Sequence, residues 1–314
     1  MEYRFLGNTG LKVSRLCFGA LTIGPLQAGL PVREGASVLR RALEQGVNFI
    51  DTAQLYGTYG HIRESMGQDY RHVIVASKSY AYTTEDMENS LTEALRGLNR
   101  DYIDLFLLHE QESELTIRGH WEAVERLIRA REKGVVRAIG ISTHSVAGVR
   151  AAAAVSEFDI IHPLINMAGI GIRDGSLNDM LAAIKGAHRA GKGLYGMKAL
   201  GGGNLLTRAQ EALDYVLALD ELAAVAVGMQ TKPEVDFNVA CFTSRPVSAL
   251  QEKLRKINRR LHVEDWCQGC GACVGLCKSG ALSVSRGKAE ADPSACRLCG
   301  YCGAACPGFC IKII

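Results

Sequence analysis

Features that would place the chain on a membrane or a nucleic acid are missing from the sequence. Aromatic residues make up only 6% of the 314 residues, and no uninterrupted apolar run reaches the length of a membrane span. The 36 basic and 33 acidic residues leave a net charge of +3, which is too small to predict a nucleic-acid or membrane partner. Residues 1–5 lack the apolar stretch of a secretion signal, so we expect a cytoplasmic protein.

Cysteine is nearly absent from most of the chain. Cys17 and Cys241 precede residue 267, and they fall in a predicted strand and a predicted helix, where a role in the core is expected. The other nine of the 11 cysteines lie within residues 267–314. Because nothing indicates export to an oxidising compartment, this concentration predicts metal binding rather than disulfides.

Short apolar runs of strand length alternate with amphipathic segments of helix length between residues 15 and 229. The eight runs are 16–20, 47–53, 73–77, 103–109, 138–142, 160–165, 193–197 and 224–229. Gly46, Gly134 and Gly191 each precede a run, where helices are expected to end. Eight buried strands, each followed by a helix, predict an α/β fold of the (β/α)8 TIM barrel type. An open doubly wound sheet is the alternative, but no G-x-G-x-x-G motif follows an early strand.

The predicted barrel occupies residues 1–245 and begins with a hairpin at 1–14, where a Gly-Asn-Thr-Gly turn joins two short extended pieces. Residues 246–261 carry apolar side chains at helical spacing, which predicts a connecting helix. Residues 262–314 contain the cysteines and are expected to form a small α+β domain. A helix over 246–261 spans about 24 Å and can lead the chain from the floor of the barrel to its mouth, where we expect this domain.

Eight of the cysteines form two copies of the motif C-x2-C-x2-C-x3-C. The first copy is Cys267, Cys270, Cys273 and Cys277, and the second is Cys296, Cys299, Cys302 and Cys306. The repeat resembles the bacterial ferredoxins with two [4Fe-4S] clusters, in which the fourth cysteine of each run binds the other cluster. The resemblance implies a cluster one on Cys267, Cys270, Cys273 and Cys306, and a cluster two on Cys296, Cys299, Cys302 and Cys277.

Three points remain open in this motif. Paired zinc sites are the alternative, because C-x2-C repeats also suit tetrahedral zinc, although zinc does not need four cysteines per run. Lys278 stands where the second run has Pro307, and it places a positive charge near a cluster. Cys310 is a ninth thiol, either a free cysteine in the core or a substitute ligand.

The ends of three consecutive predicted strands carry the polar residues that a barrel uses for chemistry. Asp51 ends the second strand with Tyr56 beyond it, Lys78 follows the third strand and His109 ends the fourth. These residues resemble the Asp, Tyr, Lys and His tetrad of the aldo-keto reductase family, and the resemblance covers residues 1–245. Each residue alone has a structural explanation, such as an ion pair between Asp51 and Lys78, but the four together favour a catalytic site.

The chemistry of carbonyl reduction explains these residue types. A hydride reduces a carbonyl only when the developing alkoxide receives a proton, and a tyrosine of ordinary pKa releases its proton reluctantly at neutral pH. We therefore expect Tyr56 to be the acid and Lys78 to lower the pKa of Tyr56. Asp51 would keep Lys78 charged, and His109 would orient the carbonyl oxygen.

The same resemblance implies a site for NADP(H), with NAD(H) as the alternative and no motif for a flavin. The implied contacts follow the strands: Gly19, Ala20, Ser142, Thr143, Asn166, Met197, Lys198, Leu200, Gly201, Gly228, Gln230, Thr231, Lys232, Glu234 and Asn238. Lys232 is the local partner expected for the 2'-phosphate, at the start of a helix whose N–H groups favour an anion.

The sequence therefore predicts an aldo-keto reductase-like oxidoreductase that interconverts a carbonyl and an alcohol with NADP(H). Its clusters would serve electron transfer or structure. Two other interpretations are an electron-transfer protein that exchanges electrons with an external ferredoxin, and a redox-sensing subunit that binds nucleotide with little turnover. The complete tetrad argues against the sensor. The expected partners are a small carbonyl or alcohol and, for electron transfer, an external carrier.

Overall fold

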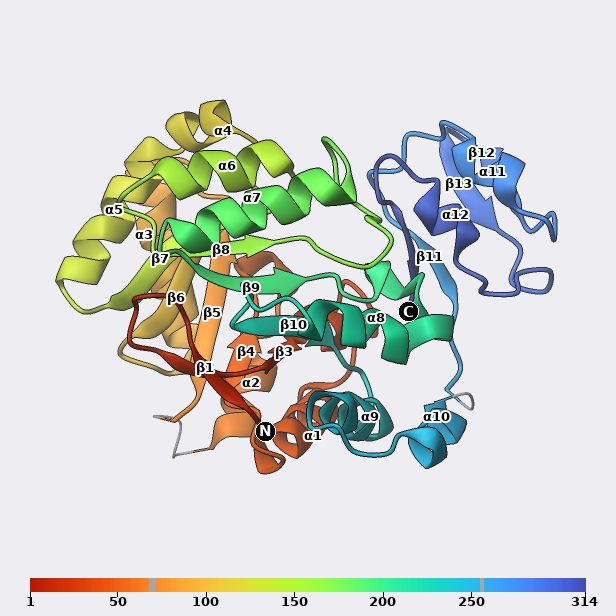
Figure 1. Cartoon of the computed structure of the whole chain (residues 1–314), viewed down its shortest axis with the longest axis horizontal. Helices are drawn as coiled ribbons and strands as arrows, with labels where there is room; N and C mark the ends of the chain where they lie inside the picture. The colour runs from red at the N-terminus through yellow and green to blue at the C-terminus, as the bar shows by residue number, and fades with distance from the viewer. Residues whose placement is uncertain (68–71, 255–256) are drawn as a thin grey trace.

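The computed structural model describes residues 1–67, 72–254 and 257–314, and its largest part is a closed parallel barrel (Figure 1). The strands are hydrogen-bonded in the order β10-β3-β4-β5-β6-β7-β8-β9. Their bounds are β3 (Leu16–Gly19), β4 (Phe49–Asp51), β5 (Ile74–Ser79), β6 (Ile103–Leu108), β7 (Val136–Thr143), β8 (Ile160–Pro163), β9 (Gly193–Met197) and β10 (Ala224–Gly228). The predicted eight-stranded α/β barrel is confirmed.

Helices follow each barrel strand and cover the outside of the barrel, so the strands are buried on both faces. The α-helices are α1 (Val32–Glu44), α2 (Tyr59–Met66), α3 (Thr84–Leu98), α4 (Glu114–Gly119), α5 (Trp121–Glu132), α6 (Val146–Ala154), α7 (Leu177–Arg189), α8 (Ala209–Leu217) and α9 (Lys232–Phe242). The 3-10 helices are η1 (Ala20–Ile23), η2 (Gln54–Tyr56), η3 (Gly201–Gly203) and η4 (Leu206–Arg208). None of the helices in the described part of the chain combines the length and the apolar character that a membrane-spanning segment requires.

The N-terminal hairpin closes the floor of the barrel, as expected. Its strands, β1 (Tyr3–Phe5) and β2 (Lys12–Ser14), pair antiparallel. Leu6 of the turn is fully buried within the apolar interior of the barrel. An added Cβ on Gly7 would lie only 2.4 Å from the backbone nitrogen of Gly193, the first residue of β9. The hairpin therefore contacts the amino ends of the strands, and the mouth lies at the opposite end.

The rest of the chain forms a C-terminal module (residues 261–314) that follows one more helix. The elements are α10 (Ser248–Leu254), β11 (Leu261–Val263), α11 (Ala272–Leu276), β12 (Leu282–Ser285), β13 (Lys288–Ala291), α12 (Tyr301–Ala304) and β14 (Ile311–Ile313). β11 pairs with β14 and β12 pairs with β13, both antiparallel. The module therefore consists of two small ribbons and two short helices.

The predicted connecting helix over 246–261 is wrong in its extent. The helix α10 ends at Leu254, residues 257–260 are not helical, and 255–256 lie outside the described residues. Arg260 instead exchanges two backbone hydrogen bonds with Ile314, of 2.8 and 3.0 Å. Pairing with a distant strand therefore overrides the local helical spacing of the apolar residues.

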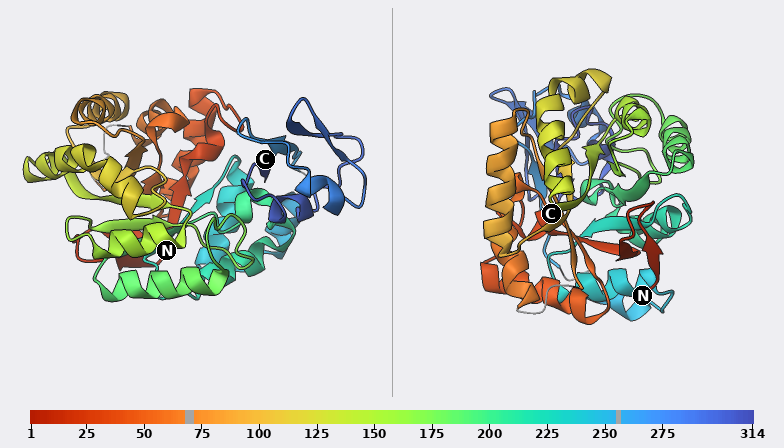
Figure 2. Two further views of the ribbon diagram at one scale, coloured as in Figure 1. Left: turned by 90° about the horizontal axis from the view of Figure 1, so that it is seen from above. Right: turned by 90° about the vertical axis from the view of Figure 1, so that its left-hand side faces the viewer.

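The module lies against the mouth of the barrel, as expected. Figures 1 and 2 show it, in blue, to one side of the barrel and beside α8. An added Cβ on Gly203, whose φ is +87°, would lie 2.1 Å from the carbonyl oxygen of Ile313. An added Cβ on Gly303 would lie 2.1 Å from the side chain of Asn204. The loop after β9 therefore packs backbone to backbone against the module.

One side chain of the module enters the barrel mouth. Phe309 is 6% exposed and packs with Ile170, Leu205 and Ala212. Its φ of +49° is in the left-handed region, which a bulky residue rarely adopts. The surrounding contacts hold this strained backbone in place just before β14.

Candidate functional site

The four residues of the predicted tetrad meet at the mouth of the barrel. Asp51 ends β4, Tyr56 ends η2, Lys78 lies in β5 and His109 follows β6. Lys78 Nζ lies 2.8 Å from the Asp51 carboxylate and donates a second hydrogen bond, of 2.7 Å, to the Thr52 carbonyl. The Tyr56 hydroxyl lies 3.4 Å from Nε2 of His109. The fold thus brings the four side chains together from three neighbouring strands.

Burial controls the protonation of the two groups that can reach a substrate. Burial, and then the Asp51 carboxylate, raise the pKa of Tyr56 well above its ordinary value. Burial, and then the Lys78 ammonium, hold the pKa of His109 well below its ordinary value. The pKa of Tyr56 is raised overall and not lowered as expected, because burial outweighs the Lys78 ammonium, which is bonded to Asp51 and the Thr52 carbonyl, 5.2 Å from the centre of the tyrosine ring.

Asp51 has partners beyond the tetrad. The Tyr195 hydroxyl donates a 2.9 Å hydrogen bond to Asp51, and Nε2 of His162 lies 3.6 Å from the same carboxylate oxygen. The rings of His162 and Tyr195 stack with their centroids 3.7 Å apart. Burial lowers the pKa of His162 to about 3, so its ring is neutral at pH 7. Nδ1 lies 2.6 Å from the Tyr195 carbonyl and must donate to it, which leaves Nε2 as an acceptor.

A cleft joins the tetrad to the loops at the mouth. Asp51, Tyr56 and His162 line one part of it, and the loops after β3, β9 and β10 line the rest. Arg259 and Ile313 also line this cleft, although they come from the last part of the chain. The barrel and the C-terminal segment therefore enclose the same space.

Six of the expected cofactor residues line the cleft: Gly19, Met197, Lys198, Leu200, Gly228 and Gln230. The remaining expected residues do not line it: Ala20, Ser142, Thr143, Asn166, Gly201, Thr231, Lys232, Glu234 and Asn238. The cleft also includes Thr22 and Gln27 after β3, which the sequence did not indicate.

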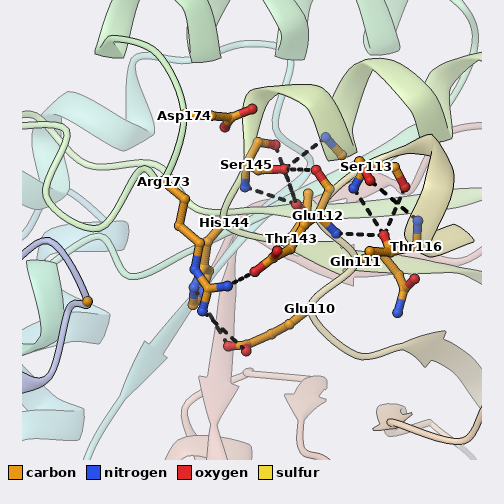
Figure 3. Close-up of polar contacts among 12 residues, drawn as sticks. Glu110, Gln111, Glu112, Ser113, Thr116, Thr143, His144, Ser145, Arg173 and Asp174 are labelled. Atoms are coloured by element: carbon orange, nitrogen blue, oxygen red, sulfur yellow. Dashed lines mark hydrogen bonds and ion pairs between the residues drawn. The ribbon is translucent and has the colours of Figure 1, made fainter. Parts of the chain in front are cut away.

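Three of the residues outside the cleft stabilise the loops that frame it. The Ser142 hydroxyl accepts a 2.9 Å hydrogen bond from the N–H of Glu110. Thr143, which is labelled in Figure 3, accepts a 3.0 Å bond from the N–H two residues further on. The Asn166 carboxamide bonds both the N–H and the carbonyl of Ile170, at 3.0 and 2.9 Å. These polar groups are therefore used within the protein.

The start of α9, the expected phosphate site, is occupied by a carboxylate of the chain itself. Glu234 accepts hydrogen bonds from the N–H groups of Gln230 and Thr231, at 2.6 and 3.0 Å. The same side chain forms a 2.5 Å ion pair with Arg259. Lys232 is exposed on the first turn of the helix. Arg259 is therefore a second cation at this end of the cleft, and the sequence did not predict it.

A charged network extends from the tetrad across the mouth. Glu110 follows His109 with a left-handed φ of +51°. Its carboxylate lies 3.6 Å from Nδ1 of His144 and 3.9 Å from Arg173 (Figure 3). Burial acts to raise the pKa of Glu110, but His144, His109 and Lys198 outweigh it and bring the pKa to about 2. Glu110 is therefore a fixed negative charge beside the tetrad.

The cysteines of the module gather in two groups. One cavity within the module is lined by Cys277, Cys296, Cys299 and Cys302. Electrostatic interactions join Cys273 to Cys267, Cys270 and Cys306. These groups combine three cysteines of one run with the fourth of the other. Among residues 1–67, 72–254 and 257–314, no three His, Cys, Asp or Glu side chains are arranged to hold a metal ion.

Backbone N–H groups point at several of the sulfurs. Cys277 and Cys306 each accept a hydrogen bond from the N–H four residues further along, at 3.3 and 3.2 Å. Cys267 accepts one of 3.4 Å from Ala289. Such bonds favour the thiolate form of cysteine. Cys310 is buried and interacts electrostatically with Cys306 and Cys267. The ninth thiol therefore lies beside the group formed by Cys267, Cys270, Cys273 and Cys306, here called the first-cluster group.

Several residues of the site escaped the sequence reasoning. Tyr195 gives one usable signal, a polar hydroxyl in the middle of an otherwise apolar strand. The ring of Tyr80 also stacks on that of His109, with the centroids 4.4 Å apart. Arg259 and Ile313 reach the cleft only because the module folds back to the mouth, which no local pattern indicates.

Comparison with known proteins identifies the family of the chain. The model of the aldo/keto reductase family matches residues 15–218, and the chain belongs to this family. L-galactose dehydrogenase of Arabidopsis thaliana is 27% identical over 292 residues, which cover 77% of this chain and 88% of that protein. Aldo-keto reductase YhdN of Bacillus subtilis (strain 168) is 31% identical over 188 residues, which cover 53% of this chain and 54% of YhdN.

Solved structures show the same architecture. The protein PA4992 of Pseudomonas aeruginosa, described as an aldo-keto reductase, matches with a TM-score of 0.66 and 26% identity over 77% of this chain and 94% of its own. The holo form of aldo-keto reductase AKR11C1 of Bacillus halodurans matches with a TM-score of 0.66 over 81% and 94%, and at 22% identity it shows the fold alone. The chain is therefore an oxidoreductase of a family that generally uses NADP(H). The family match ends before the cysteine-rich module.

Proposed function

We propose that the protein interconverts a carbonyl and an alcohol with NADP(H), and that its module binds two [4Fe-4S] clusters. The observation that carries the proposal is the cleft in which Tyr56 and Asp51 share walls with the loops after β3, β9 and β10. A ligand held by these loops can present its reactive end to the Tyr56 hydroxyl. Hydride and proton transfer to one carbonyl require this arrangement.

Several residues that line the cleft support the binding of a nicotinamide dinucleotide. Gly19 and Gly228 are partners at the ends of β3 and β10, where an added Cβ would approach the backbone of Val227 or the side chain of Thr22. Nε2 of His162 is a free acceptor for a carboxamide N–H. Lys198 lines the cleft and suits phosphate, while Arg259 joins Lys232 as a candidate for the 2'-phosphate. When bound, the nicotinamide supplies the hydride.

The residues of this chain handle the proton and the substrate oxygen. Tyr56 keeps its proton at neutral pH, so its hydroxyl can donate to the oxygen being reduced, and it accepts the proton in the reverse direction. His109, neutral and 3.4 Å from that hydroxyl, can orient the same oxygen. Lys78, fixed by Asp51, supplies the positive charge that stabilises the tyrosinate left after the transfer.

The arrangement of the cysteines favours clusters over single ions. Tetrahedral zinc with sulfur ligands at about 2.3 Å would bring its sulfurs within about 3.8 Å of one another. Four cysteines line one cavity within the module, and each run carries four cysteines in one repeated spacing, which zinc does not need. The N–H groups aimed at Cys267, Cys277 and Cys306 suit the thiolates of iron-sulfur clusters. Such clusters also fit the cytoplasm, where thiols stay reduced.

The position of the module favours a second role, electron exchange with an external one-electron carrier. Cys270 and Cys299 are exposed, so a carrier can approach both clusters. Phe309, three residues after Cys306, reaches the barrel mouth. The module therefore extends from exposed thiols to the barrel mouth, which favours a path for electrons over a purely structural role.

Two measurements test the proposal on anaerobically purified protein. Iron and acid-labile sulfide should each be present at about eight per chain, whereas stoichiometric zinc without sulfide would exclude the clusters. Aldehydes, ketones and alcohols are then assayed with NADPH or NADP⁺, with NADH or NAD⁺ as the comparison and the Tyr56→Phe variant as the background. The catalytic part fails if no substrate turns over faster than this background.

A further inference from the structure

Lys312 on β14 is a buried lysine with no carboxylate at ion-pair distance among the described residues. It is 3% exposed, and its only hydrogen bond among the described residues goes to the carbonyl of Phe309. No ion pair joins it to a carboxylate of the described chain. Burial, and then Lys198, lower the pKa of Lys312 to about 6, while Glu264, Cys306 and Cys310 act to raise it. The four side chains that influence its charge are therefore Lys198, Glu264, Cys306 and Cys310. Two of these four are thiols at the first-cluster group.

A second ammonium lies on the same aromatic ring. Nζ of Lys312 lies 2.8 Å, and Nζ of Lys198 5.6 Å, from the centre of the Phe309 ring. Lys198 also has no ion-pair partner within the described ranges. Two buried like charges repel each other, and a buried charge is costly unless an opposite charge lies nearby. Glu264 acts on both lysines from beyond ion-pair distance. A closer anion beside Phe309 would raise the pKa of Lys312 and keep its ammonium charged.

Cluster one is such an anion. This step rests on the proposed function, in which the module binds two clusters. A cubane held by four thiolates is negatively charged, and one-electron reduction adds a further negative charge. Burial strengthens the attraction between that charge and a nearby ammonium, because little water screens it. The attraction grows on reduction, so the ammonium favours the reduced cluster.

We propose that Lys312 is the internal counter-charge of cluster one and holds its reduction potential above that of cluster two. The cavity of cluster two is lined by residues of the module alone, and the neighbouring Lys278 is exposed to solvent, where its charge is screened. An electron that enters the module therefore settles in cluster one. This cluster faces the active site. The centroids of the Phe309 and His144 rings lie 6.2 Å apart, and Ile313 lines the cleft that contains Tyr56.

The test compares midpoint potentials in cluster-replete protein by anaerobic redox titration monitored by electron paramagnetic resonance. Lys312→Gln should lower the potential of one cluster and leave the other unchanged, while Lys312→Arg, which keeps the charge, should preserve both. Lys278→Gln is the matched control beside Cys277, and its shift should be smaller. The proposal is overturned if Lys312→Gln moves neither cluster, or moves both equally.

If the Lys312→Gln variant does not assemble its clusters, a second variant tests the proposal. Lys198→Gln removes the other ammonium at Phe309 and should lower the potential of one cluster by a smaller amount. No shift in Lys198→Gln would then refute the role of charge at this ring. The outcome is separable from the proposed function. Wild-type protein without iron and sulfide refutes the clusters themselves, whereas a full complement of iron with unchanged potentials refutes only the role of Lys312.

Discussion

The hydroxyl of Tyr195 donates a 2.9 Å hydrogen bond to Asp51, the carboxylate that also pairs with Lys78. The tyrosine comes from β9 and the lysine from β5, so two separate strands of the barrel hold the carboxylate. Hydrogen bonds to a charged group contribute about 1.5–3 kcal/mol, more than ordinary ones. The position of Lys78, and the charge beside Tyr56, therefore depend on a residue outside the tetrad.

Tyr195→Phe should lower both stability and turnover. We expect a loss of about 1.5–3 kcal/mol in the free energy of unfolding, measured by urea denaturation, because Asp51 loses a donor. We also expect a lower kcat, because Lys78 is held less firmly. Tyr59→Phe is the matched control, since Tyr59 is hydrogen-bonded at 2.7 Å to Ser77 and is not among the cleft residues. A similar drop in kcat for both variants would argue against a special role for Tyr195.

Tyr56→Phe should nearly abolish carbonyl reduction while nucleotide affinity stays close to that of the wild type. The change removes the proton donor, and loss of a positioned acid costs about 100-fold to 10,000-fold in rate. Steady-state kinetics give the first quantity and a fluorescence titration with NADPH gives the second. A variant that keeps more than about a tenth of the wild-type turnover would show that another group donates the proton.

Cys306→Ser and Cys310→Ser should separate the ligand from its neighbour. Loss of Cys306 should reduce the iron content from about eight to about four per chain, because cluster one loses its fourth thiolate. Loss of Cys310 should leave about eight, because this thiol is not part of either predicted set. Iron and sulfide analysis after anaerobic purification gives the answer. The reverse pattern would make Cys310 the ligand.

The protein should lose stability as the pH falls from about 6.5 towards 4. Burial lowers the pKa of His144 to about 4 and that of His162 to about 3, whereas the unfolded chain binds protons at about 6.5. Below pH 6.5 the unfolded state therefore binds more protons, and each histidine costs up to about 1.4 kcal/mol per pH unit. Unfolding free energies measured between pH 7 and 4 should show this slope, and His162→Asn should reduce it. A flat profile would show that these rings are not buried in neutral form.

NADPH alone should not reduce the clusters in protein free of flavin. A hydride carries two electrons and each cluster accepts one, so coupling needs a group that can hold a single electron. None of the tetrad residues is such a group. The broad visible absorbance of the clusters should therefore persist after anaerobic addition of NADPH, and fall after addition of a one-electron reductant. Rapid bleaching by NADPH would reveal a coupling that the cleft does not explain.

The sequence predicts the barrel well because each strand is a short apolar run that packs on both faces. It also predicts where Asp51 and Lys78 meet, since in a parallel barrel neighbouring strand ends must converge. The pKa of Tyr56 was not predictable, because it depends on burial and on the bonds that occupy Lys78. The unwinding of residues 257–260 follows from pairing with a strand far along the chain. Periodicity within that segment carries no information about such a partner.

The contact of Gly203 with Ile313 links the cleft to the whole module. In a barrel whose loop after the strand equivalent to β9 is free, a bound dinucleotide leaves when a few residues of that loop move outwards. Here the loop is pressed against a folded body, and Asn204 adds a hydrogen bond of 3.1 Å to the Ile311 carbonyl. The loop opens only when the module moves with it, so the residence time of a ligand depends on how firmly the module is folded. If the module holds the proposed clusters, their loss by oxidation would shorten that residence time before it changed any residue of the tetrad.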